Sequence, residues 1–172
     1  MLYFSSLLKT NPQYFTSAQN LFTALDTNKI KCDFLPGTKD IWVRDFMPVQ
    51  GKDGTYISFR YEPSYLKDQP KLRTDSRRDI GGRFSIFDGP DNVIYSNINL
   101  DGGNVVFSPT KEKAIISDRV FSENPGYDRA TLVRELKQRI KEVLALHGIN
   151  TIYFPLPWRE CGRVLPQLSG DL

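Results

Sequence analysis

The sequence predicts an α/β protein of the α+β type, folded as a single domain over residues 1–172. Two segments repeat apolar side chains at the three- and four-residue steps of an amphipathic helix, and short β-rich runs lie between and after them. The chain also lacks the glycine patterns that mark nucleotide-binding folds. At 172 residues it can bury one core, whereas two thin domains would be hard to stabilise.

Residues 11–28 predict the first helix, because apolar side chains recur along one face and Pro12 suits the first turn. The run KIKCDF at 29–34 alternates lysines with apolar residues, as a strand does. IWVRDFMPV at 41–49 predicts a second strand, and TYISFRY at 55–61 a third. The intervening GKDG indicates a hairpin turn between these two strands.

Residues 62–91 are rich in Pro, Gly, Asp and Arg, which predicts a long functional loop rather than a core element. Three β-rich runs follow at 92–100, 104–109 and 113–118. Strands beside a helix thus occur in both halves of the chain, a pattern that indicates an internal repeat.

The segment at 128–148 predicts the clearest helix, which Asp128 can cap and Gly148 can end. A last strand is expected at 149–157. The apolar stripe of the helix contains Val133, Leu136, Ile140, Val143 and Leu144.

Charge and cysteine content narrow the possible partners and the cellular location. The net charge is +3, and the densest basic stretch, 71–79, is interrupted by two aspartates, so we expect no nucleic-acid binding. Cys32 and Cys161 have neither C-x-x-C spacing nor a histidine cluster beside them, which argues against a metal site and favours a reducing cytoplasm. No run approaches the roughly twenty apolar residues of a membrane span, so we expect no membrane partner.

The stretch DIWVRDFMPVQ places charged residues inside an apolar run. Strand alternation would put Trp42, Arg44 and Phe46 on one face and Asp45 on the other, among apolar neighbours. A buried carboxylate needs a partner, and a guanidinium fits, because it is planar, stacks on aromatic rings and donates two parallel hydrogen bonds to a carboxylate. The alternative is an internal ion pair that uses Arg44.

A second stretch, NLDGGNVVF, places Asp101 and the pair Gly102–Gly103 between two predicted strands. Two glycines permit positive φ and remove both Cβ atoms, which allows a substrate or a neighbouring strand to approach closely. The alternative is a tight β-turn, for which D-G-G-N is a suitable sequence.

Together, W-x-R-D-x-x-P and the later D-G-G-N resemble the N-terminal part of the agmatine deiminase and bacterial-type peptidylarginine deiminase family, guanidine-modifying enzymes with the five-bladed pentein fold. The resemblance implies a partial pentein-type α/β propeller built from ββαβ-like units, with this chain as its N-terminal half. The residues that match are Trp42, Arg44, Asp45, Pro48, Asp101, Gly102, Gly103 and Asn104.

By that resemblance Asp45 would be a catalytic carboxylate that grips the substrate guanidinium, and Trp42 would wall the same pocket. Arg44 would brace the loop. Asp101 would form hydrogen bonds within the site, and the turn at 102–104 would contribute pocket backbone. The family hydrolyses a guanidine C–N bond of agmatine or peptidyl-arginine through a cysteine thiolate and a histidine, and it needs no metal or organic cofactor.

The sequence departs from the family at the catalytic machinery. G-H-x-D and a late cysteine are missing from the sequence, and Gln167 and Ser169 stand at the acid–base positions. His147 is expected to complement a helix C-terminus, Cys161 has no histidine partner, and Cys32 is expected in the core. We therefore expect the chain alone to bind guanidines without turning them over.

Two further expectations remain. A non-catalytic α/β binding or structural module is the alternative function, in which both motifs are only a strand end and a turn. Half of a propeller would also leave strand edges uncovered, which predicts self-association.

Overall fold

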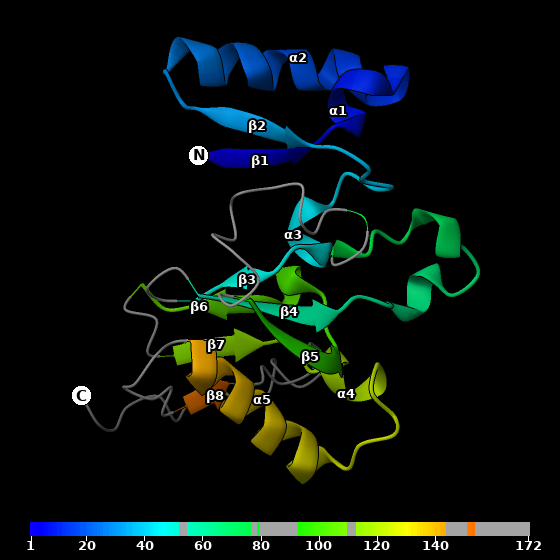
Figure 1. Cartoon of the computed structure of the whole chain (residues 1–172), viewed down its shortest axis with the longest axis vertical. Helices are drawn as coiled ribbons and strands as arrows, with labels where there is room; N and C mark the ends of the chain where they lie inside the picture. Colours follow the sequence, from blue (N-terminus) through cyan, green and yellow to red (C-terminus); the bar gives the residue numbers. More distant parts are fainter. Residues whose placement is uncertain (52–54, 77–78, 80–92, 110–112, 144–150, 154–172) are drawn as a thin grey trace, which may run out of the picture.

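A computed structural model describes the chain over residues 1–51, 55–76, 79, 93–109, 113–143 and 151–153. Within these ranges the protein combines helices with three small sheets, which confirms the α/β class (Figure 1). No closed barrel or propeller is formed by the described residues. No helix in this part of the chain is both long and apolar enough to cross a membrane.

The first sheet pairs β1 (Leu2–Ser5) with β2 (Cys32–Leu35) in parallel. The connection between them carries α1 (Leu7–Thr10) and α2 (Pro12–Thr27), and these elements form one end of the molecule in Figure 1. The sequence analysis did not predict β1, and β2 begins later than the predicted strand at 29–34.

Helix α2 confirms the predicted amphipathic segment and its start. The side chain of Asn11 accepts a hydrogen bond from the amide of Gln13 at 3.0 Å, which satisfies one free donor of the first turn. Ala18 and Leu25 lie buried on its inner face. Apolar periodicity therefore predicted the extent of this helix, although Leu21 on the same stripe is 42% exposed.

The second sheet has the order β3 (Val49–Gln50), β4 (Tyr56–Arg60), β5 (Val93–Asn99). β3 and β4 are antiparallel, as the predicted hairpin requires, whereas β4 and β5 are parallel. The described part of the connection from β4 to β5 contains two 3-10 turns, η1 (Ser64–Leu66) and η2 (Pro70–Leu72).

The third sheet, β6 (Val105–Phe107), β7 (Lys113–Ile116) and β8 (Thr151–Tyr153), repeats this arrangement. β6 and β7 are antiparallel, and β7 and β8 are parallel. The connection from β7 to β8 contains α4 (Arg119–Ser122) and α5 (Arg129–Val143). In both sheets a hairpin is thus followed by a crossover to a parallel third strand.

Helix α5 contacts β4 and β5 and joins the larger core (Figure 1). As predicted, Asp128 caps the helix, since its carboxylate accepts from the Thr131 amide at 3.0 Å. The buried members of this core are Val49, Ile57, Phe59, Ile98, Leu100, Val105, Ala114, Ile116, Val120, Leu132, Leu136 and Ile140.

The predicted stripe of this helix is only partly correct. Leu136 and Ile140 are buried as expected, but Val133 is half-buried and the fully buried neighbour is Leu132. The side chain of Val143 and the whole of Leu144 lie outside the described residues.

The prediction of one continuous strand at 41–49 is wrong. The chain forms a short helix, α3 (Val43–Phe46), before it enters β3. The amide of Met47 donates to the carbonyl of Val43 at 3.0 Å, which closes a helical turn. Met47 itself is extended, as expected for a residue before Pro48, and this ends the helix.

Candidate functional site

The first motif lies at α3, and its side chains do not alternate as predicted. Phe46 is 2% exposed, whereas Trp42 is 62% exposed, so these two rings do not share a face. Trp42 precedes the first residue of α3, and its carbonyl accepts from the Asp45 amide at 2.9 Å. The turn thereby places the side chain of Asp45 in a half-buried position.

The second motif forms a 3-10 turn, η6 (Gly102–Asn104), between β5 and β6. The turn is closed by the Asn104 amide, which donates to the carbonyl of Asp101 at 2.9 Å. Neither glycine has a positive φ, and in the described residues Gly37 is the glycine that does. Backbone conformation alone therefore does not require Gly102 and Gly103.

Close packing against α3 explains both glycines. A Cβ atom at Gly102 would run into the backbone carbonyl oxygen of Arg44 and would lie 3.2 Å from that of Met47. A Cβ atom at Gly103 would overlap Oδ1 of Asp45. The two motifs, far apart in the sequence, are thus brought into direct contact.

Two polar contacts hold this junction together. The amide of Gly103 donates to the carboxylate of Asp45, and Nη2 of Arg44 donates to the carbonyl of Val105 at 2.7 Å. Within the described ranges, Arg44 and Asp45 form no ion pair. Arg44 therefore ties α3 to the start of β6, and Asp45 remains without a cationic partner at bonding distance among these residues.

Asp101 is the second carboxylate of the site and is only 8% exposed. Oδ2 accepts a hydrogen bond from Nδ2 of Asn104 at 3.3 Å. Burial raises the pKa of Asp101 to about 6, and the charges of Asp45 and Glu123 raise it as well, while Arg119 opposes them.

The pKa of Asp45 is also raised, first by burial and then by the charge of Asp40. The Gly103 amide and the charge of Arg44 lower it without cancelling the rise. Because Asp45 and Asp101 lie close enough for one charge to disfavour the other, a bound cation would stabilise both as carboxylates.

The site thus consists of two carboxylates beside a glycine turn. No family model and no curated protein matches the chain. A functional assignment therefore depends on the residues of the chain itself.

Sequence reasoning did not identify two tyrosines next to these carboxylates. The hydroxyl groups of Tyr61 and Tyr65 are 3.0 Å apart, and the Tyr61 ring packs edge-on against Phe46 with ring centroids 6.1 Å apart. Burial raises the pKa of both hydroxyls, and the charges of Asp101 and Asp45 raise it further. The Y-E-P-S-Y spacing where the predicted strand at 55–61 meets the predicted loop was the available signal.

A charged cluster on α4 holds the turn that carries Tyr65. Glu123 accepts from the amide and the hydroxyl of Ser64, at 2.9 and 2.8 Å, and pairs with Arg119 at 2.8 Å. Although burial raises the pKa of Glu123, these hydrogen bonds lower it overall. The guanidinium carbon of Arg119 lies 4.9 Å from the centre of the Tyr65 ring.

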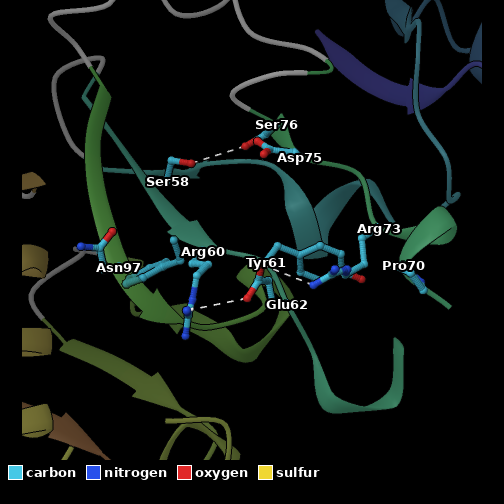
Figure 2. Close-up of a pocket in the computed structure, with 10 residues that line it drawn as sticks. Ser58, Arg60, Tyr61, Glu62, Pro70, Arg73, Asp75, Ser76 and Asn97 are labelled. Atoms are coloured by element: carbon cyan, nitrogen blue, oxygen red, sulfur yellow. Dashed lines mark hydrogen bonds and ion pairs between the residues drawn. The ribbon is translucent and has the colours of Figure 1, made fainter. Parts of the chain in front are cut away.

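A cavity of about 370 Å³ is lined by Tyr61 and by residues of β4, η2 and β5 (Figure 2). Glu62 pairs there with Arg73 at 3.3 Å and with Arg60 at 3.7 Å. The residues that line the cavity are Ser58, Phe59, Arg60, Tyr61, Glu62, Pro70, Arg73, Asp75, Ser76 and Asn97. Tyr61 therefore lines this cavity, whereas Trp42, Asp45 and Asp101 do not.

The thiol and imidazole groups do not join the site in the described part of the chain. Cys32 is half-buried on β2, and this part of the chain holds no group of three or more His, Cys, Asp or Glu side chains that could bind a metal. His147, Cys161, Gln167 and Ser169 lie outside the described residues.

Proposed function

We propose that this chain carries the guanidinium-binding part of a guanidine deiminase, similar to the N-terminal part of agmatine and bacterial-type peptidylarginine deiminases. The observation that carries the proposal is the contact between the two motifs: Asp45 lies against Gly103, and its charge raises the pKa of Asp101. Two half-buried or buried carboxylates with raised pKa values favour a cationic ligand.

The ligand would be a planar guanidinium, because each carboxylate can accept two of its parallel N–H groups. Asp45 and Asp101 would hold the ligand in line for attack at its central carbon, and their charges would balance the cation. In the family reaction a cysteine thiolate then attacks this carbon, ammonia leaves, and water releases a urea-type product. The thiolate and the proton-transferring histidine are not assigned in this chain, so we expect binding without turnover.

The topology supports the finer fold proposal, a partial pentein-type propeller. The second and third sheets share one pattern, an antiparallel hairpin followed by a crossover to a parallel strand, and α5 lies in the second crossover. This pattern is the ββαβ-like unit from which such a propeller would be built. A guanidine deiminase of this type would act in the cytoplasm.

Calorimetric titration with agmatine tests the function. We expect weak binding by the wild type and a loss of at least about tenfold in affinity for Asp45→Asn, since one charged hydrogen-bond acceptor is removed. The melting temperature should change little, because the fold disfavours the ionised form of Asp45. Asp68→Asn, a change at an exposed carboxylate, is the matched control.

The alternative is a non-catalytic structural module, and the tight packing at Gly102 and Arg44 favours it as the competing explanation. In that case agmatine would not bind, and Asp45→Asn would act on stability alone. Binding that is unaffected by Asp45→Asn would equally contradict the proposed site.

We also propose that the chain self-associates. The first sheet contains two strands, so among the described residues one edge of β1 and one of β2 have no strand partner. Light scattering on a size-exclusion column should show a mass that rises with protein concentration. A constant monomer mass would exclude this association.

A further inference from the structure

Tyr61 and Tyr65 differ in their access to solvent although their hydroxyl groups are 3.0 Å apart. Tyr61 is 8% exposed and belongs to the smaller core with Phe46, whereas Tyr65 is 49% exposed. Tyr65 is therefore the member of the pair that an incoming molecule can reach.

Both hydroxyl groups lie within electrostatic reach of the two proposed guanidinium-binding carboxylates. Burial raises the pKa of both hydroxyls. The charges of Asp101 and Asp45 raise the pKa of each hydroxyl further. The Tyr61 ring packs against Phe46, the residue after Asp45, with ring centroids 6.1 Å apart, and the Tyr65 hydroxyl lies 3.0 Å from that of Tyr61, so both tyrosines lie beside α3.

The hydrogen-bonding capacity of this region leaves a place for Tyr65. A guanidinium on an alkyl chain carries five N–H donors and no acceptor. The carboxylate of Asp45 already accepts from the Gly103 amide, and Oδ2 of Asp101 accepts from Asn104. A ligand that meets both carboxylates therefore retains N–H groups for a further acceptor, and the hydroxyl oxygen of the exposed Tyr65 is a candidate.

The ring of Tyr65 already accommodates one guanidinium. Arg119 stacks over it at 4.9 Å while Glu123 fixes both Arg119 and the Ser64 turn. Aromatic rings attract guanidinium groups through their negatively polarised faces. The contact with Arg119 shows that the surroundings of this ring are compatible with a guanidinium.

We propose that Tyr65 contacts the guanidinium ligand, accepting a hydrogen bond from it through the hydroxyl group, and that it is a specificity-determining residue of the site formed by Asp45 and Asp101. This inference rests on the proposed function, because Tyr65 has this role only if those carboxylates bind a guanidine. Glu123 and Arg119 are then positioning residues, since they act by holding the turn that carries Tyr65.

Titration of agmatine into Tyr65→Phe tests the inference, because this change removes the hydroxyl group and keeps the ring. We expect the affinity to fall about five- to tenfold relative to the wild type, as for one lost hydrogen bond. Tyr95→Phe is the matched control, an exposed tyrosine on β5 that lies outside the site, and it should bind as the wild type does. Circular dichroism melting checks that each variant is folded.

A second measurement reports on the ring itself. In protein labelled with ¹³C at tyrosine Cζ, the Tyr65 resonance, assigned by its absence in Tyr65→Phe, should shift on addition of agmatine. It should stay fixed in Asp45→Asn, in which the ligand is no longer held.

The outcomes separate the two proposals. If agmatine binding depends on Asp45 but Tyr65→Phe binds normally and the Tyr65 resonance does not move, the role of Tyr65 is overturned and the proposed function stands. If the wild type binds no agmatine, both proposals fall. If Tyr65→Phe loses affinity while Asp45→Asn does not, the ligand does not sit between the carboxylates, which contradicts both.

Discussion

The carboxylate of Asp45 lies so close to the backbone of Gly103 that a Cβ atom at this glycine would overlap Oδ1. The amide of Gly103 donates to the same carboxylate. Close packing and this hydrogen bond together fix the position of Asp45 relative to η6. This relationship links α3 to the turn before β6. It is also the relationship on which the proposed guanidinium site depends.

Gly103→Ala should weaken agmatine binding more than it weakens the fold. The added methyl group meets a side-chain oxygen, so Asp45 can rotate away at modest cost in stability but loses its position. Titration calorimetry and thermal melting on the same variant measure the two effects. Normal affinity in Gly103→Ala would show that the position of Asp45 does not matter.

Gly102→Ala should destabilise the protein by about 1–3 kcal/mol, because its methyl group meets backbone oxygens of α3 that cannot rotate away. Urea denaturation measures the loss. Gly126→Ala is the matched control, since nothing lies within 4 Å of a Cβ atom there. Equal stability of the Gly102 and Gly126 variants would contradict the packing described for η6.

Stability should fall as pH rises from about 4 to about 7, in part through Asp101. Its folded pKa of about 6 lies above the ordinary value of 3.8, so in this window the folded state binds more protons than the unfolded state. The ionised group then costs the fold about 3 kcal/mol at neutral pH. Asp101→Asn should remove this part of the pH dependence.

Urea denaturation of the wild type and of Asp101→Asn at both ends of this window checks the prediction. The difference in unfolding free energy between the two proteins should grow in favour of the variant as pH rises. A difference that stays constant with pH would show that the pKa of Asp101 is not raised. Agmatine affinity of the wild type should rise across the same window, because the ionised carboxylate binds the cation.

Arg44→Met should cost about 1–2 kcal/mol of stability, since the carbonyl of the buried Val105 loses its charged donor. Arg134→Met, a change at an exposed position on α5, is the control and should have little effect. Chemical denaturation compares the two variants. Equal stabilities would mean that the bond to Val105 contributes nothing to the fold.

Asn124→Ala should be among the most destabilising single changes, at about 2–4 kcal/mol. The buried Asn124 side chain bonds the amide and the carbonyl of Asn99 and the carbonyl of Val120, each at 2.8 Å. Asn97→Ala, at an exposed position of β5, is the matched control. Equal melting temperatures for the two variants would count against the network.

Sequence patterns predicted those elements in which buried apolar side chains recur at a regular spacing or a turn signal is present. Helix α2, the capped start of α5 and the hairpin of β3 and β4 follow the expected periodicities and turn signals. The failure at 41–49 has a specific cause: Arg44 and Asp45 bond to Val105 and Gly103, which are distant in the sequence, and a helical turn lets both reach them.

The candidate site was only partly predictable, because contacts between residues distant in the sequence decide its geometry. The resemblance identified Asp45 and the turn at 102–104, which the structure brings together, but it did not indicate how they touch. Trp42 was expected in a pocket wall and instead is mostly exposed. Tyr61 and Tyr65 were missed, because their surroundings are formed by carboxylates and by α4, which are distant in the sequence.

The repeated hairpin-then-crossover order has a consequence for folding kinetics. β3 and β4, and likewise β6 and β7, pair across short turns, whereas β5 and β8 close their sheets only after long excursions of the chain. Local pairings form early and non-local parallel ones late. The amides of β5 and β8 should therefore gain protection from hydrogen exchange after those of the hairpins, so that refolding proceeds in two resolvable stages within each sheet.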